Sequence, residues 1–257
     1  VEVDLGNLTH NWSEIRRLVS PQVRIRQVVK ADAYGHGSIE VSNVALQNGA
    51  THLGVANADE GVQLRVGGIE APIIILSPSI ESEIPEIIKY NLTPSVSDIG
   101  FAREINRRLK KTGMKLPIHI EVDTGMGRGG TLYSEAFDMI REVSGLSQLT
   151  PEGIFTHLSS SEAEKDEYNR MQWELFKTLL DRLEQSGITF PIRHMANSGG
   201  VLNFRRFHLD MVRPGIMSYG IYPSPDLESK ARLLPVMSFK TRVMLLKEFP
   251  EGHGIGY

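Results

Sequence analysis

The chain has 257 residues, a formal net charge of −3, and 40% hydrophobic and 23% charged residues. This length can bury a full-sized core, and the composition is ordinary for a globular protein. The sequence contains no long basic run, so it gives no support to binding of nucleic acid or of a membrane surface. Because the chain has 0 cysteines, disulfides, zinc–thiolate sites and a cysteine nucleophile are excluded.

No apolar stretch approaches the roughly 20 residues that a membrane-spanning helix needs. The opening segment Val1–Leu5 lacks the basic and apolar regions of a signal peptide. We therefore expect neither a membrane span nor secretion, and we expect a cytoplasmic protein. The chain starts without an initiator methionine, so we expect a processed product or a fragment.

Short apolar runs rich in β-branched residues alternate with longer amphipathic stretches, which is the pattern of repeated βα units. The predicted strands are Arg24–Val29, His52–Ala56, Ile73–Leu76, Thr93–Val96, Ile118–Val122, Gly153–His157, Ile192–Ala196 and Met211–Val212. Two of the stretches between them, Asp98 to Lys111 and Asp166 to Ser186, are predicted helices with a glycine close behind. About eight such strands predict a (β/α)8 barrel of the TIM type, with a doubly wound open sheet as the alternative.

The composition changes after Tyr219. Residues Tyr222–Asp226 (YPSPD) have the composition of a linker, and Pro235–Leu246 has that of a strand without a following helix. We therefore predict three parts. Residues 1–5 form a strand that belongs with a β-rich domain, residues 6–222 form the barrel, and residues 223–257 form a linker and the truncated beginning of that β-rich domain.

The first candidate site residue is Lys30, in the segment VVKADAYGHG. It follows a predicted buried strand, so it lies at the carboxyl end of the barrel, where such enzymes place their active sites. A lysine amine can form an imine with an aldehyde there. A lone lysine at a strand end more often only extends into solvent. However, Tyr34 and two glycines close behind add a hydroxyl group and a backbone that permits close approach.

The segment EVDTGMGR, from Glu121 to Arg128, ends another predicted strand in a turn bracketed by glycines. Glycines permit tight turns with positive φ, and this turn brings Arg128 to the same rim. An arginine is always charged and can donate hydrogen bonds to a phenolate or a carboxylate. The alternative is an ordinary strand-to-helix turn with a solvated arginine.

Two further strands end in polar groups. His157 ends one of them, and its alternative role is a structural hydrogen bond. Asn197 and Ser198 open the segment NSGG after the next strand. Backbone N–H groups and a hydroxyl that meet at a helix start make a candidate phosphate site.

The last predicted strand leads into Arg213, Gly215 and Ile216, in the segment VRPGI. Phosphate sites of such barrels frequently use the loops after the seventh and eighth strands, and two of the candidate segments are there. Lysine, tyrosine, arginine, histidine, serine and glycine candidates on one rim indicate a single site.

Five segments occur in an order that resembles the bacterial alanine racemase family, the fold-type III enzymes of pyridoxal 5'-phosphate (PLP): VVKADAYGHG, EVDTGMGRGG, THLSSSE, HMANSGG and MVRPGIMSYG. The opening VEVDLGNLTHNW is similar to the start of that family, so the resemblance covers essentially the whole chain. It implies a PLP-dependent racemase that interconverts L- and D-alanine, built as a barrel and a β domain and working as a head-to-tail homodimer. The D-alanine product would be a peptidoglycan precursor.

The matching motifs imply a role for each candidate residue. Lys30 would hold PLP as a Schiff base and act as one of two acid/base groups, and Tyr257, in the segment GIGY, would be the other, reaching the site of the partner subunit. Tyr34, Ser198 and the backbone of Gly215 and Ile216 would bind the phosphate. Arg213 would face the pyridine nitrogen, with His157 nearby. Arg128 would contact the phenolic oxygen, and Asn197 would make an additional contact. No metal site is predicted.

Two positions depart from the family pattern. Glu121 stands where the family often has a lysine modified to a carbamate, and we expect its carboxylate to pair with Arg128 instead. Gly256 stands where a serine often precedes the last tyrosine. Two alternatives remain: a non-catalytic PLP-carrier protein of the same barrel type, and a racemase of another amino acid, such as serine or lysine.

Overall fold

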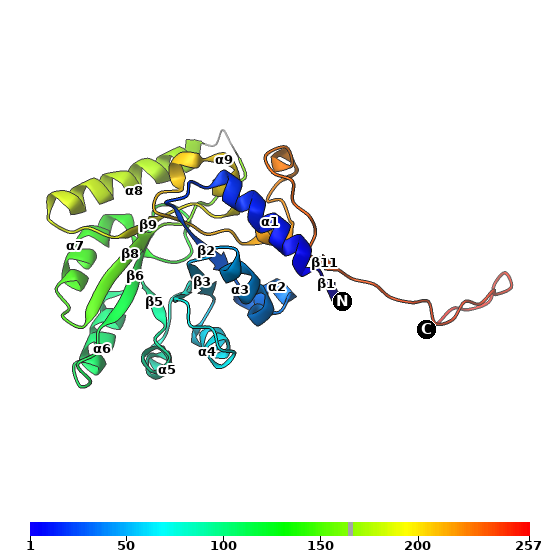
Figure 1. Cartoon of the computed structure of the whole chain (residues 1–257), viewed down its shortest axis with the longest axis horizontal. Helices are drawn as coiled ribbons and strands as arrows, with labels where there is room; N and C mark the ends of the chain where they lie inside the picture. The colour runs from blue at the N-terminus through cyan, green and yellow to red at the C-terminus, as the bar shows by residue number, and fades with distance from the viewer. Residues whose placement is uncertain (164–166) are drawn as a thin grey trace.

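The computed structural model describes residues 1–163 and 167–257. Eight strands, each parallel to its neighbours, form a closed ring, because β10 pairs with β2 and β5 pairs with β6 (Figure 1). In ring order they are β2 (Arg24–Val28), β3 (His52–Val55), β4 (Ile73–Ile75), β5 (Thr93–Val96), β6 (Leu116–Asp123), β8 (Leu149–Phe155), β9 (Ile192–His194) and β10 (Met211–Val212). The closure confirms the predicted (β/α)8 barrel and excludes an open sheet, which has two free edges.

Helices surround the ring on its outside (Figure 1). They are α1 (Leu5–Leu18), α3 (Ser38–Gln47), α4 (Ala58–Val66), α5 (Ile84–Lys89), α6 (Ile99–Leu109), α7 (Tyr133–Ser144), α8 (Glu167–Gln185) and α9 (Ser198–Asn203). The predicted start at Asp98 is the N-cap of α6, where the Asp98 carboxylate accepts a hydrogen bond from the Phe101 N–H. The predicted start of the later helix, Asp166, lies outside the described residues.

The helix α1 shows how the outer layer is attached. Its residues Leu8, Trp12 and Ile15 lie on one face and are fully buried, and the helix packs beside α3. Burial of each such side chain contributes about 1.5–3 kcal/mol. Apolar contacts outside the ring thus hold the helices, which leaves the rim and the interior of the ring available for polar groups. Of the helices in residues 1–163 and 167–257, none has the length and apolar character to cross a membrane.

The two ends of the chain meet in a short ladder, where β1 (Glu2–Val3) pairs antiparallel with β11 (Met237–Ser238). The strand predicted over residues 1–5 is therefore shorter, since Leu5 already belongs to α1. The prediction of a strand over Pro235–Leu246 is wrong beyond Ser238, because residues 239–257 contain neither helix nor strand. Their apolar side chains are not covered by a core, as the 89% exposure of Leu246 shows, and isolated strands are not stable in water.

Candidate active site

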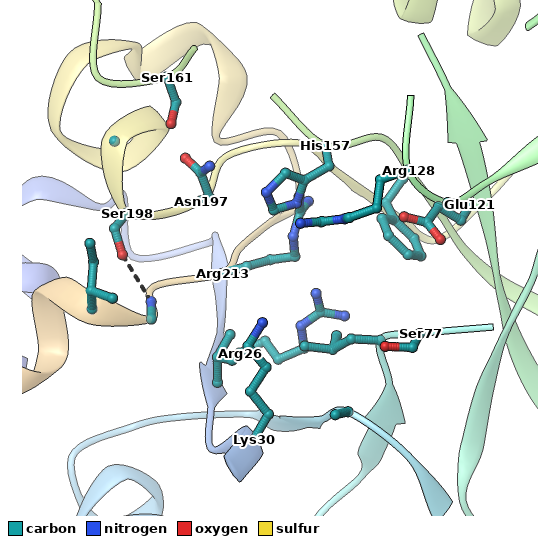
Figure 2. Close-up of a pocket in the computed structure, with 18 of the residues that line it drawn as sticks. Arg26, Lys30, Ser77, Glu121, Arg128, His157, Ser161, Asn197, Ser198 and Arg213 are labelled. Atoms are coloured by element: carbon teal, nitrogen blue, oxygen red, sulfur yellow. Dashed lines mark hydrogen bonds between the residues drawn. The ribbon is translucent and has the colours of Figure 1, made fainter. Parts of the chain in front are cut away.

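A cavity of about 620 Å³ opens at the carboxyl ends of the barrel strands (Figure 2). It brings together almost all predicted site residues, which are Lys30, Tyr34, Arg128, His157, Asn197, Ser198, Arg213, Gly215 and Ile216. Tyr257 is the exception, because it is fully exposed and does not line the cavity of its own chain. Residues far apart in the sequence thus share one concave site.

Lys30 begins a short turn of unusual hand, α2 (Lys30–Gly35). The four successive residues from Ala31 to Tyr34 have φ values of 52°, 51°, 54° and 55°. The left-handed region costs an L-residue roughly 1–2 kcal/mol, so this backbone is strained. Strain of this kind persists only where the surroundings enforce it, and it is concentrated at functional sites. Both Lys30 and Tyr34, at the two ends of the strained run, line the cavity.

Two carboxylates enforce the left-handed turn. Glu60 of α4 accepts hydrogen bonds from the backbone N–H of Ala31 at 2.9 Å and of Ala56 at 2.7 Å, which ties the turn to the end of β3. Within the turn, Asp32 accepts a hydrogen bond from the N–H of Ser38 at 2.7 Å. Hydrogen bonds to ionised acceptors are about twice as strong as neutral ones, so these contacts offset part of the strain.

Tyr34, Ser198 and Gly215 form a cradle of hydroxyl and backbone N–H groups on one side of the cavity. The Ser198 hydroxyl accepts a hydrogen bond from the N–H of Gly215 at 2.9 Å (Figure 2) and another from the N–H of Met217 at 3.3 Å. A Cβ atom on Gly215 would lie 3.2 Å from the Tyr34 hydroxyl oxygen, so a larger residue would crowd this approach. Asn197 accepts a hydrogen bond from the N–H of Gly200 at 3.0 Å, which fixes the start of α9 beside the cradle.

Arg213 is 4% exposed, and both ends of its guanidinium are held in place. Nη1 donates to Nδ1 of His194 at 3.1 Å, and Nη2 donates to the Thr156 carbonyl at 2.9 Å and to Nδ1 of His157 at 3.2 Å. The Nε N–H has no acceptor among the described residues, and the side chain lines the cavity. Burial lowers the pKa of Arg213 to about 10, against the opposing attraction of Glu121, so the guanidinium is charged at neutral pH.

His157 is uncharged at neutral pH. Burial lowers its pKa well below the ordinary value, and the positive charges of Arg213, Arg128 and Lys30 lower it further. An arginine N–H can only donate, so Nδ1 of His157 accepts and the proton of the neutral ring is on Nε2. His157 therefore offers the cavity a hydrogen-bonding group without a charge.

A buried arginine and a buried carboxylate also line the cavity. Arg26 is 1% exposed and Glu121 is 6% exposed, and both have side-chain atoms without a hydrogen-bond partner, Nε and Nη1 of Arg26 and Oε2 of Glu121. Burial, and then repulsion from Arg213, lowers the pKa of Arg26 well below its ordinary value. Burial raises the pKa of Glu121, against the attraction of Arg213 and Arg128. Buried polar atoms seldom lack partners, so these atoms indicate that the cavity receives a polar ligand or water.

The prediction that Glu121 pairs with Arg128 is wrong. No hydrogen bond or ion pair joins these two described residues, and Arg213 has the larger electrostatic effect on the Glu121 carboxyl group. The backbone of the glycine turn lies against the carboxylate instead, since a Cβ on Gly129 would be 3.0 Å from Oε2. The turn directs the Arg128 side chain away from Glu121 and toward His157 (Figure 2).

Several residues that line the cavity were not predicted from the sequence, among them Arg26, Ser77 and Ser161. A signal existed for Arg26, because it shares a strand face with Val28, two residues on, and the inward positions of barrel strands are normally filled by branched apolar side chains. Ser77 and Ser161 lie in loops, where no period in the sequence indicates which side chains face a cavity.

Comparison with known proteins places these features in a family. The family model described as alanine racemase, N-terminal domain, matches residues 3–223. The alanine racemase of Halothermothrix orenii is 42% identical over 256 residues, which are 100% of this chain and 68% of that protein. Alanine racemase 2 of Caldanaerobacter subterraneus is 40% identical over 258 residues, which are 100% of this chain and 66% of that protein. The chain thus spans about two thirds of the length of these relatives.

Solved structures agree with the sequence matches. The alanine racemase of Bacillus anthracis with bound L-Ala-P aligns with a TM-score of 0.92 and 33% identity, over 100% of this chain and 67% of that one. The alanine racemase of Clostridium difficile in complex with cycloserine aligns with a TM-score of 0.89 and 34% identity, over 91% of this chain and 65% of that one. Sequence and fold both confirm the resemblance seen in the motifs, and the chain belongs to the alanine racemase family.

Proposed function

We propose that this chain is the cofactor-binding barrel of a PLP-dependent racemase that interconverts L- and D-alanine. The observation that carries the proposal is the cavity, where the Lys30 amine, the unused Nε of Arg213 and the cradle around Ser198 meet. The relatives named above are alanine racemases, which favours this activity over a non-catalytic PLP carrier.

The residues of the cavity fit the functional groups of PLP. Hydroxyl and backbone N–H groups around Ser198 and Gly215 suit a phosphate, because they donate hydrogen bonds to anionic oxygen. The Nε N–H of Arg213 suits the pyridine nitrogen, which accepts a hydrogen bond. Arg128 suits the phenolic oxygen, and the Lys30 amine, whose Nζ lies 5.9 Å from the centre of the Tyr34 ring, suits the aldehyde carbon.

Two acid/base groups are needed to invert Cα, one on each face of the substrate. When bound, PLP supplies an electron sink that acidifies the Cα–H bond. We assign Lys30 to take or return the proton on one face and Tyr257 of the partner subunit to do so on the other, in a head-to-tail homodimer. The exposure of Tyr257, and its absence from the cavity of its own chain, support a role across a subunit boundary.

Arg213 controls the outcome of the reaction through its charge. With a pKa of about 10 it keeps its proton at neutral pH, so it would donate a hydrogen bond to the ring nitrogen of bound PLP without protonating that nitrogen. A ring that is largely unprotonated withdraws fewer electrons, which disfavours side reactions such as transamination. We expect Arg213→Glu to slow racemisation and to raise pyruvate formation from alanine in the full-length enzyme. Pyruvate formation equal to that of the wild type would contradict this role.

The experiment that tests the proposal is a racemisation assay of a panel of L-amino acids with the full-length protein and PLP. We expect alanine to react fastest. A faster reaction of serine or lysine would identify a racemase of another amino acid, and PLP binding without any racemisation would identify a carrier.

Borohydride treatment of the PLP-loaded protein tests the cofactor lysine separately. We expect peptide mapping to place the reduced adduct on Lys30, and we expect Lys30→Ala to lower racemisation by at least about 10²–10⁴-fold, since it removes an acid/base group. Lys89→Ala, on the outer helix α5, is the matched control and leaves the adduct unchanged. An adduct on another lysine would overturn the assignment.

A further inference from the structure

A row of buried side chains connects Arg213 with the interior of the barrel. Nη1 of Arg213 lies 3.1 Å from Nδ1 of His194, and Nε2 of His194 lies 2.8 Å from Nδ1 of His119. On the other side of the His119 ring, Nε2 lies 3.5 Å from Oε2 of Glu152. Both imidazoles are fully buried, and the Glu152 side chain is 34% exposed.

The backbone around this row is adapted to it. A Cβ atom on Gly153 would lie 2.2 Å from Nδ1 of His119, so this position in β8 accepts only glycine while the imidazole stays in place. The pairing of β6 with β8 shifts at Ile118 and His119, which leaves Glu152 as an extra residue in the ladder. Such a bulge re-aims a side chain, and here the re-aimed side chain is the one that approaches His119.

The row has a single direction of hydrogen-bond donation. Arg213 has only donors, so Nδ1 of His194 must accept and the proton of this neutral ring is on Nε2. That proton is donated to Nδ1 of His119, which places the His119 proton on Nε2. This last N–H has no formed hydrogen bond among the described residues, and the Glu152 carboxylate at 3.5 Å lies within a small side-chain rotation of it. A buried donor without an acceptor costs about 1–3 kcal/mol, which favours closure of this contact.

The surroundings keep both histidines neutral. Burial lowers the pKa of His194 and of His119, and the positive charges of Arg26 and Arg213 act in the same direction on both. Glu152 opposes this effect at His119, and the interaction lowers the pKa of Glu152. Two neutral rings between a guanidinium and a carboxylate can pass on a hydrogen-bond direction without adding a charge of their own.

We propose that Glu152 is a positioning residue for Arg213, because it ends a one-directional row of donors that runs from Arg213 through His194 and His119. The row fixes the plane of the guanidinium and so aims its Nε N–H into the cavity. The inference rests on the proposed function for its effect on the reaction, whereas the proton positions in the two imidazoles do not depend on it.

Nitrogen-15 NMR of the histidine side chains tests the proton positions in the full-length protein, without and with PLP. Assignment uses His119→Gln and His194→Gln. We expect both rings to be neutral, with the proton on Nε2 and Nδ1 as the acceptor. A proton on Nδ1 of either ring, or a charged ring at neutral pH, would overturn the inference.

Two variants at position 152 test the effect on the cofactor side. Glu152→Leu removes the acceptor, whereas Glu152→Gln keeps a carbonyl oxygen and removes only the charge. For Glu152→Leu we expect altered signals of both histidines, PLP affinity weakened about tenfold, and a raised share of transamination. For Glu152→Gln we expect smaller changes in the same direction. The matched control is Glu104→Leu, which removes a carboxylate paired with Arg107 on the outer helix α6 and leaves these readouts unchanged.

The outcomes separate this inference from the proposed function. If the wild type racemises no amino acid, the proposed function fails while the histidine spectra still decide whether the donor row exists. If Glu152→Leu alters only stability, with the wild-type PLP affinity and transamination share, Glu152 is merely structural and the inference fails. Should Glu152→Leu not fold, Glu152→Gln gives the same decision, because the loss of charge alone must alter the His119 signal.

Discussion

Two sets of ionisable side chains are buried inside the barrel, and burial leaves them in different states. The first set is Arg26, Glu121 and Arg213, which line the cavity. The second set is His52, His119 and His194, which do not line it. Burial lowers the pKa of Arg213 from 12.5 to about 10, which leaves it charged at neutral pH. Burial lowers the pKa of His52 from 6.5 to about 4, which leaves it neutral.

The difference lies in the residue type and not in the surroundings. Desolvation disfavours the charged form of both groups. However, the ordinary pKa of arginine is so far above neutral pH that a similar lowering of the pKa leaves its charge intact. The barrel can therefore hold a permanent charge where the cofactor and substrate would bind and place neutral hydrogen-bonding rings beside it. Three perturbations test this separation between a charged set and a neutral set.

The largest expected effect comes from removing the charge of Arg213. Arg213→Leu leaves the acceptors of His194, His157 and Thr156 without their donor, and it leaves the buried Glu121 with less compensation. Removal of one partner from a buried charged group typically costs about 3–5 kcal/mol of unfolding free energy. Denaturant unfolding measures this loss. The control is Arg193→Leu, which removes a partly exposed ion pair with Asp210 and costs less than about 1 kcal/mol.

The second perturbation is acid, which should charge the neutral set. The folded pKa of His52 is about 4 and the unfolded pKa is 6.5, so the unfolded state binds more protons between these values. Its contribution to stability is therefore present above pH 6.5 and is lost as the pH falls to 4, by up to roughly 3 kcal/mol. The measurement is the slope of unfolding free energy against pH for the wild type and for His52→Gln.

We expect His52→Gln to have the shallower slope in this range, whatever its absolute stability. His253→Gln, at an exposed position outside the barrel, is the control for the loss of one imidazole. Equal slopes for the wild type and His52→Gln would show that His52 is already protonated, or is solvated, in the folded protein.

The sequence predicted the positions at strand ends much better than the contacts between them. Lys30 and Arg213 could be placed on one rim because parallel strands of a closed barrel end at the same side. The contact between Glu121 and Arg128 could not be predicted in this way, since the direction of a side chain after a glycine turn depends on backbone angles that residue spacing does not fix.

The contacts of the buried histidines and the lack of a strand after Ser238 could not be predicted from the sequence either, for different reasons. His119 and His194 occupy strand positions that look ordinary, and their connection to Arg213 depends on the registers of strands distant in the sequence. Residues 239–246 have the composition of a strand but form none, because a strand needs a partner and a core as well as local propensity.

The smallest expected effect concerns Glu121. Its sign shows whether the Glu121 carboxylate mainly stabilises the neighbouring arginines or is mainly destabilised by its own burial. If Glu121 mainly stabilised its arginine neighbours, Glu121→Gln would destabilise the protein at neutral pH. However, burial raises its pKa despite the attraction of Arg213 and Arg128, so the ionised form is less favourable in the folded state than in the unfolded one. Such a group contributes stability at low pH and loses it as the pH rises through the folded pKa.

We therefore expect Glu121→Gln to be at least as stable as the wild type at pH 7, with a gain of about 1 kcal/mol or less that vanishes toward pH 4. Denaturant unfolding at several pH values measures this difference. Glu104→Gln provides the contrast, because hydrogen bonds from Arg107 and Arg108 lower the pKa of Glu104 to about 2, and the sign for this variant is the opposite. A loss of stability in Glu121→Gln at pH 7 would mean that the two buried arginines beside it, Arg26 and Arg213, need this carboxylate to remain buried together.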